Sequence, residues 1–110
     1  MKQRDIWLAD LNPVKGSEQR GIRPVVIISG NAMNDNLNIA IICPLSSKIK
    51  QYAGCIVLQK DEQNGLSDDS EIITFQVRTI AQERLIKKLG QISEKELVNI
   101  KMGLNEILTY

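Results

Sequence analysis

Residues 12–23 carry the side chains of this sequence that are best suited to chemistry. The segment reads NPVKGSEQRGIR and combines a carboxylate, a carboxamide and three cationic groups with two glycines. A connection of this length is usually either mobile or a binding and catalytic loop on a rigid scaffold. The density of hydrogen-bonding groups favours a binding or catalytic loop. Its chemistry-bearing residues are Lys15, Glu18, Gln19, Arg20 and Arg23.

The composition limits which chemistry this loop can perform. The sequence contains no histidine, which is the usual general base and the commonest zinc ligand. The two cysteines, Cys43 and Cys55, lie among apolar residues and lack the further ligands that a metal site or redox motif requires. We therefore expect two buried free thiols, no bound metal and no cofactor.

Charge is unevenly distributed along the chain, whose net charge is +1. Residues 1–60 contain eight Lys and Arg against four Asp and Glu, whereas residues 61–110 contain six against nine. The cations accompany the first loop, an arrangement that permits a polyanionic ligand and also occurs on surfaces without one. The opening residues, MKQRDIW, contain no apolar signal core, so we expect a cytoplasmic protein without a membrane span.

The length of 110 residues and the hydrophobic content of 43% suit one modest core, and we predict a single domain over residues 1–110. Alternating or β-branched apolar runs predict short strands. Pro44 cannot donate to a strand ladder, so it places the end of the third strand at an edge or a bulge. The predicted strands cover residues 6–11, 23–29, 38–45, 54–59, 71–77 and 85–92.

The pattern of residues 93–110 predicts one long terminal helix. Ser93 and Glu96 have the spacing of a capping box at its start. Gly103 indicates close approach to a neighbouring element. Short strands followed by this helix predict a mainly β fold, a small antiparallel barrel of five to seven strands with a C-terminal α-helix. Apolar residues recur on one face of the helix: Leu97, Ile100, Leu104, Ile107 and Leu108.

Four motifs, taken in order along the chain, resemble those of the MazF/PemK family of toxin endoribonucleases. They are GSEQRGIRPVVII, PLSSKI, FQVRTI and LGQIS. The resemblance implies an SH3-like β-barrel homodimer that cleaves single-stranded RNA without a metal ion. It also implies a MazE-like antitoxin partner with a partly disordered acidic tail, and any DNA contact would be made only through that antitoxin.

The same resemblance assigns catalytic roles to two residues. Arg23 precedes Pro24, which favours extended backbone, and would aim its guanidinium at the scissile phosphate. Ser46 stands where relatives commonly carry threonine and would donate a hydrogen bond to that phosphate, with Ser47 as a neighbouring contact. Taken without the family pattern, both serines would be ordinary turn residues.

RNA-binding and positioning roles fall to six further residues. Glu18 would either accept the proton of the 2′-hydroxyl or hold the loop in place, and we favour positioning. Arg78 is expected mainly to support the structure. Phe75 stands where some relatives carry a carboxylate, and it would stack on an RNA base or belong to the core. The six residues are Lys15, Glu18, Gln19, Arg20, Gln76 and Arg78.

Two alternatives to a nuclease remain open at this point. A non-catalytic module of the same fold would bind a protein target such as a topoisomerase, because a fold alone does not determine function. A purely structural SH3-like barrel would account for the strands, but it would leave the composition of the first loop unexplained.

Overall fold

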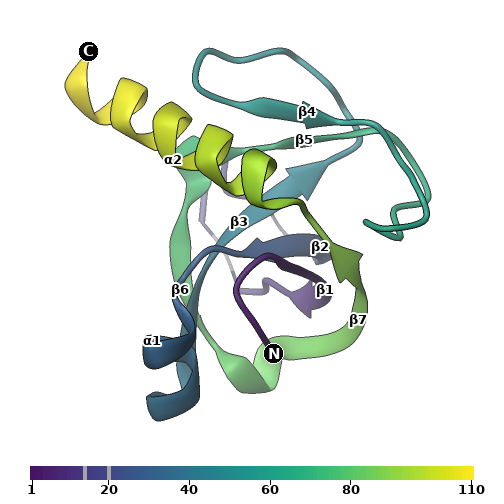
Figure 1. Cartoon of the computed structure of the whole chain (residues 1–110), viewed down its shortest axis with the longest axis vertical. Helices are drawn as coiled ribbons and strands as arrows, with labels where there is room; N and C mark the ends of the chain where they lie inside the picture. The colour runs from purple at the N-terminus through teal and green to yellow at the C-terminus, as the bar shows by residue number, and fades with distance from the viewer. Residues whose placement is uncertain (14, 20) are drawn as a thin grey trace.

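The computed structural model describes residues 1–13, 15–19 and 21–110. Within these ranges, short strands are followed by one long helix, which confirms the predicted mainly β fold with a C-terminal helix (Figure 1). Neither α-helix there has the length and hydropathy needed to cross a membrane. The helices are α1 (Asn31–Asn36) and α2 (Glu94–Thr109), with short 3-10 helices η1 (Thr74–Gln76) and η2 (Gln82–Arg84). The strands are β1 (Asp5–Asp10), β2 (Ile22–Ile27), β3 (Ile39–Ser46), β4 (Ile56–Leu58), β5 (Ser70–Ile72), β6 (Arg78–Ala81) and β7 (Leu85–Gln91).

Strand β3 organises the sheet. The antiparallel order is β4-β5-β3-β2-β1-β7, with β6 also paired to β3. On the side away from β2, residues 39–42 of β3 pair with β6, and residues 45–46 pair with β5. Pro44 lies at this change of partner, where its carbonyl accepts a hydrogen bond from the Ile73 amide at 2.9 Å. Of the edge or bulge expected at Pro44, the edge is wrong, because the strand is central. Proline is tolerated because the ladder on this side is interrupted between residues 42 and 45.

The predicted strand over residues 71–77 is instead a corner, in which β5 gives way to η1 and then to β6. The Gln76 amide donates to the Ile73 carbonyl at 3.1 Å, which closes the turn. The Thr74 hydroxyl donates to the Gly54 carbonyl at 2.9 Å and ties the corner to the preceding loop. Hydrophobic periodicity could not reveal this corner, because EIITFQV has the pattern of one continuous strand, and the strands on both sides of the corner pair with β3.

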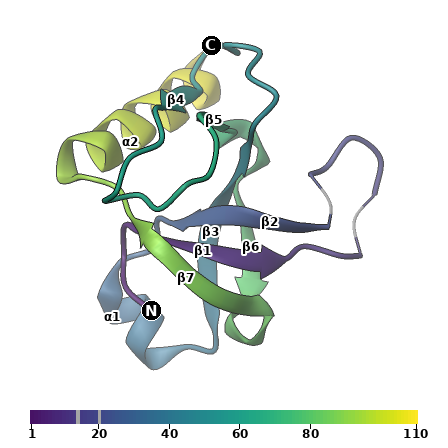
Figure 2. The ribbon, with the colours of Figure 1, turned by 90° about the vertical axis from the view of Figure 1, so that its right-hand side faces the viewer.

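The two ends of the sheet approach each other through the loop of residues 59–69 (Figure 2). The Gln91 amide of β7 donates to the Gln63 carbonyl in this loop at 2.9 Å. A Cβ atom on Gly65, whose φ is +67°, would lie 1.9 Å from the Leu89 carbonyl oxygen. Glycine is therefore required for this contact. The described ladders thus form a curved sheet whose terminal strands are connected by a loop.

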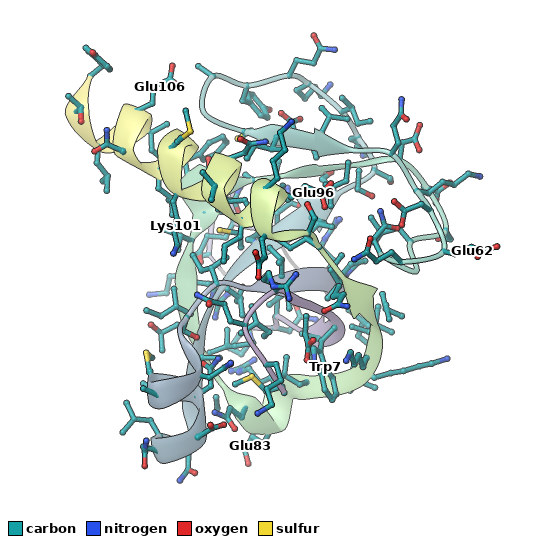
Figure 3. The ribbon with its side chains drawn as sticks, viewed as in Figure 1. Trp7, Glu62, Glu83, Glu96, Lys101 and Glu106 are labelled. Carbon is teal, nitrogen blue, oxygen red and sulfur yellow. The ribbon has the colours of Figure 1, made fainter. Side chains whose placement is uncertain are left out.

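Helix α2 lies beside β4 and β5 (Figures 1 and 2) and has the predicted capping box. Ser93 Oγ accepts a bond from the Glu96 amide at 3.1 Å, and Glu96 Oε1 accepts one from the Ser93 amide at 2.8 Å. Figure 3 shows Glu96 at this first turn. Leu97 and Ile100 are buried, but Leu108 is 82% exposed, because the last turn extends beyond the sheet. The predicted apolar face therefore ends before Leu108.

Close approach at Gly103 is confirmed. A Cβ atom on this residue would lie 2.1 Å from the carbonyl oxygen of Gly54, in the loop before β4. This contact brings the middle of α2 against the backbone of the loop that Thr74 also binds. The helix and the β5–β6 corner are therefore fixed to the same short segment.

Two clusters of buried side chains lie on opposite faces of β2 and β3. The first includes Val26 and Cys43, and the second includes Val25 and Ile42. Consecutive residues of a strand point to opposite faces, so the alternation confirms that β2 is covered on both sides. Cys43 is buried as predicted, whereas Cys55 is only half-buried, and its Sγ lies 3.5 Å from the Thr74 hydroxyl.

Candidate active site

Arg23 and Ser46 lie on the same face of two neighbouring strands. Val25 of β2 is directly opposite Pro44 of β3, and side chains that are directly opposite share a face. Toward the first loop, the next residues on that face are Arg23 and Ser46. Val25 belongs to the second core cluster. Arg23 and Ser46 therefore lie beside that cluster, where the paired strands β2 and β3 end near the first loop.

The serine hydroxyl has a defined partner. Ser46 is 6% exposed, and its Oγ accepts a hydrogen bond from the Lys48 amide at 3.2 Å. Because the hydroxyl accepts this bond, it retains its own proton for donation to a ligand. Arg23 is half-buried and carries a planar guanidinium with several donors. The two strand ends thus present a cationic group and a hydroxyl on one face.

A buried carboxylate that the sequence analysis missed faces this serine. Glu71 of β5 is opposite Ser46 in the ladder and is fully buried. Its Oε1 accepts bonds from the amides of Lys50 and Gln51 at 2.8 and 3.2 Å. Its Oε2 accepts one from the Tyr52 amide at 2.9 Å. Glu71 therefore fixes the loop that follows β3. The available signal was a single charge within the otherwise strand-like run SEIIT.

Gln76 holds the first loop against the β5–β6 corner. Its Oε1 accepts a bond from the Gln19 amide at 2.6 Å, and its Nε2 donates to the Ser17 carbonyl at 3.3 Å. Both ends of one carboxamide thus bind loop backbone. The contact also forms part of a small groove of about 190 Å³, which is lined by Leu11, Glu18, Gln19, Pro44, Phe75, Gln76, Val77 and Arg78.

Glu18 and Arg78 make a second connection between the loop and β6. Glu18 Oε1 accepts a bond from the Lys15 amide at 3.1 Å, and its Oε2 lies 3.9 Å from the guanidinium of Arg78. Arg78 also donates to the Leu11 carbonyl at 3.4 Å. Because half of the Glu18 side chain is exposed, solvent screens this ion pair and its contribution to stability is small. Its structural effect is to orient the loop.

Pro44 connects the groove to the arginine and the serine. It lines the groove and lies two residues before Ser46 on the same face of β3, a separation of about 7 Å. The structure therefore gathers four of the predicted residues around this groove: Glu18, Gln19, Gln76 and Arg78. The strand register places Arg23 and Ser46 on the same face of β2 and β3 as Pro44, which lines the groove.

Three predicted residues stand apart from this group. Lys15 contacts Glu18 through its backbone amide, and its side chain is exposed. Arg20 lies outside the described residues. Ser47 lines a different groove of about 480 Å³, formed with Leu8, Pro24 and Leu45 among others, which Arg23 also borders. The two adjacent serines therefore contribute to different surfaces.

Phe75 is 47% exposed and lines the small groove, so it does not belong to the core. The sequence alone left this position open, because an aromatic residue in an apolar run is compatible with either the core or an exposed RNA-binding surface. The 3-10 corner determines the outcome, since it turns this side chain outward between two strands that are buried against β3.

Comparison with known proteins shows which family this chain belongs to. Residues 2–108 match the PemK-like, MazF-like toxins of type II toxin-antitoxin systems. The chain is 35% identical to the endoribonuclease MazF of Staphylococcus saprophyticus over 118 residues, which cover 100% of this chain and 98% of that protein.

Solved structures show the same fold. MazF from Deinococcus radiodurans has a TM-score of 0.81 at 22% identity, with 99% of this chain and 96% of that chain covered. A mycobacterial endoribonuclease in complex with its cognate antitoxin has a TM-score of 0.80 at 17% identity, with coverage of 98% and 94%. The match of residues 2–108 and the full-length relative confirm the predicted resemblance and enzyme class: the chain belongs to the PemK-like, MazF-like toxin family of type II toxin-antitoxin systems, as a toxin of the endoribonuclease type.

Proposed function

We propose that this toxin cleaves single-stranded RNA by attack of a ribose 2′-hydroxyl on the adjacent phosphodiester. The bond between O2′ and phosphorus forms while the bond between phosphorus and O5′ breaks. The 2′-hydroxyl loses its proton as it attacks, and the departing 5′-oxygen gains one, so the products are a 2′,3′-cyclic phosphate and a 5′-hydroxyl with no net change in protons. The observation that carries this proposal is the shared face of Arg23 and Ser46 at the ends of two paired strands.

The roles of the two residues follow from the chemistry of the substrate. RNA supplies its own nucleophile, so the protein has to orient the phosphodiester and stabilise the charge that develops on it. The planar guanidinium of Arg23 suits two phosphate oxygens at once. The Ser46 hydroxyl donates to a non-bridging oxygen. The proposal uses no metal ion and no cofactor in these steps.

The remaining residues have supporting roles in this proposal. Glu18 is a positioning residue, because both of its carboxylate oxygens are engaged by Lys15 and Arg78. Gln76 positions the loop in the same way. The Gln19 side chain contacts a base edge, for which a carboxamide has both a donor and an acceptor. Contacts to the RNA backbone are assigned to Lys15, Arg20 and Ser47.

The proposed protein partners use the same surface. Two relatives of known structure were solved with antitoxins, one of them a MazE–MazF complex from Deinococcus radiodurans. We assign this chain a MazE-like antitoxin whose partly disordered acidic tail orders on the cationic face and excludes RNA. Any DNA contact is made through that antitoxin. The toxin acts as a homodimer in the cytoplasm, with its groove spanning both subunits, and sedimentation as a monomer at micromolar concentration would contradict this arrangement.

The test of cleavage uses purified toxin and a long single-stranded RNA in EDTA. Fragments with 5′-hydroxyl ends are expected, and polynucleotide kinase labels such ends without prior phosphatase treatment. Arg23→Ala should lower the cleavage rate at least about 10²-fold, as removal of a charge-stabilising group does in other enzymes. Glu106→Gln, at an exposed position on α2, is the matched control and should leave the rate unchanged.

Two outcomes would contradict the proposal. RNA that stays intact across varied sequences would exclude the nuclease reaction under these conditions. An Arg23→Ala variant that remains fully toxic in cells would favour the non-catalytic module that binds a protein target.

A further inference from the structure

Tyr52 and Phe75 form an exposed aromatic pair at the edge of the proposed catalytic face. Their ring centroids are 5.2 Å apart, and the ring planes meet at 85°, which is an edge-to-face arrangement. Each residue is 47% exposed. Edge-to-face packing leaves the face of one ring available, and unpaired nucleic-acid bases stack on such faces.

The pair is held in place from both sides. The Tyr52 amide is bonded to the buried carboxylate of Glu71 at 2.9 Å. Phe75 lies in η1, next to Thr74, whose hydroxyl binds the Gly54 carbonyl at 2.9 Å. The loop that carries Tyr52 is thus tied to the β5–η1 segment on both sides of the tyrosine. A contact that is formed before binding loses little conformational entropy when a ligand arrives.

The position of Phe75 relates the pair to the scissile phosphate. Phe75 lines the small groove together with Pro44, which precedes Ser46 by two residues on the same face of β3. Gln19 and Gln76 line that groove as well. A base next to a phosphate held by Ser46 therefore lies within reach of the Phe75 ring and of the Gln19 carboxamide, which can bind its edge.

We propose that Phe75 and Tyr52 form a stacking platform for one unpaired RNA base next to the scissile phosphate, and that this contact contributes to cleavage specificity. The inference rests on the proposed RNA cleavage. A base suits the platform better than an apolar peptide side chain does, because the hydrogen-bonding carboxamide of Gln19 lines the same groove as the Phe75 ring. Lys48 and Lys50, exposed in the loop of Tyr52, supply positive charge for the RNA backbone.

The binding test uses an RNA oligonucleotide that contains the cleavage sequence mapped on the long RNA. A single 2′-deoxy nucleotide at the cleaved position removes the nucleophile, so binding is measured without reaction. Phe75→Ala should weaken binding about 5- to 150-fold, the range for loss of one stacked base, and Tyr52→Ala should weaken it less. Phe75→Trp should retain affinity. Ile86→Ala, at an exposed apolar residue of β7, is the control and should leave affinity unchanged.

A second series identifies the stacked base by replacing each nucleotide in turn with an abasic one. At one position, the abasic nucleotide should lower the affinity of the wild-type protein for the RNA but should lower that of Phe75→Ala little further. The abasic nucleotide and the Phe75→Ala substitution would then remove the same contact. Additive losses at every position would overturn the platform. Conversion of Phe75→Ala to a monomer in sedimentation would also overturn it, by identifying the rings as a subunit contact. Cleavage by wild-type protein is measured separately, so failure of the platform is distinct from failure of the nuclease proposal.

Discussion

Replacement of Glu71 by glutamine tests how the loop after β3 is held. The carboxylate is fully buried and accepts three backbone bonds, from Lys50 and Gln51 on Oε1 and from Tyr52 on Oε2. Glutamine has the same shape but only one acceptor oxygen. Its amide group would therefore point at least one N–H toward a backbone N–H of the loop. Gln51 has a φ of +58°, which is uncommon for a residue with a side chain, so the loop depends on these bonds.

The expected loss of stability follows from these contacts. A hydrogen bond to a charged group contributes about 1.5–3 kcal/mol, and a buried donor without a partner costs about 1–3 kcal/mol. Burial of a neutral amide costs less than burial of a carboxylate, which offsets part of the loss. We expect Glu71→Gln to lower the free energy of unfolding by about 2–4 kcal/mol. Domains of this size are stable by about 5–15 kcal/mol, so the variant remains folded.

Urea denaturation at one fixed protein concentration measures this change. The midpoint should fall by about 1–2 M with an unchanged slope. Glu106→Gln, the same substitution at an exposed position on α2, should shift the free energy by less than about 0.5 kcal/mol. Hydrogen exchange at the Tyr52 amide should accelerate in Glu71→Gln. Equal midpoints for the two variants, with unchanged exchange at Tyr52, would refute the role of Glu71.

Contacts elsewhere in the fold give four further predictions. Gly103→Ala should lower the free energy of unfolding by about 1–3 kcal/mol in urea denaturation, since the added methyl group meets the Gly54 carbonyl and the clash outweighs the better helix propensity. Alkylation at pH 8 should modify Cys55 and spare Cys43 until the chain unfolds, as mass spectrometry would show, because burial and then the nearby Cys55 raise the pKa of the Cys43 thiol to about 12. Since this folded-state pKa exceeds the thiol's ordinary value of 9.0, the protonated thiol contributes fully to stability below about pH 9, and urea midpoints should reveal that contribution declining as the pH rises toward 12. Gln76→Ala should slow RNA cleavage about 10- to 100-fold with little change in stability, because both bonds that it removes hold a surface loop; an unchanged rate would argue against loop positioning.

Elements with strong local signals were predictable from the sequence. The capping box of Ser93 and Glu96 defines the start of α2, and the apolar spacing of Leu97 and Ile100 identifies its buried face. The run RPVVIIS alternates between two core clusters in the structure, as expected for a strand covered on both sides. Arg23 lies at the junction of loop and strand as predicted, since β2 begins at Ile22, whereas its catalytic role came from the family resemblance and stays a prediction. In each case the information lies within about one turn of helix or one strand.

Features that depend on distant partners were not predictable. The run EIITFQV has the composition of one strand, but only its first residues pair with β3, as part of β5. The rest of the run forms the corner that leads into β6, which pairs with a different part of β3. Glu71 was not identified because its role depends on amides about twenty residues away in sequence. The exposure of Phe75 depends on the same corner. Local patterns do not specify which segment of a chain a strand will meet.

The change of partner along β3 explains how one short strand brings the candidate groups together. Helix η1 lies between β5 and β6, the two strands that pair with different parts of β3. It places Gln76 in contact with the first loop and leaves Phe75 exposed. The serine follows on the same strand, where β3 pairs with β5. A shift of β3 by one residue would place Ser47 on this face and turn Ser46 away, because strand side chains alternate. The register of Val25 with Pro44, fixed by buried residues on both faces, therefore determines which of two chemically identical serines shares a face with Arg23.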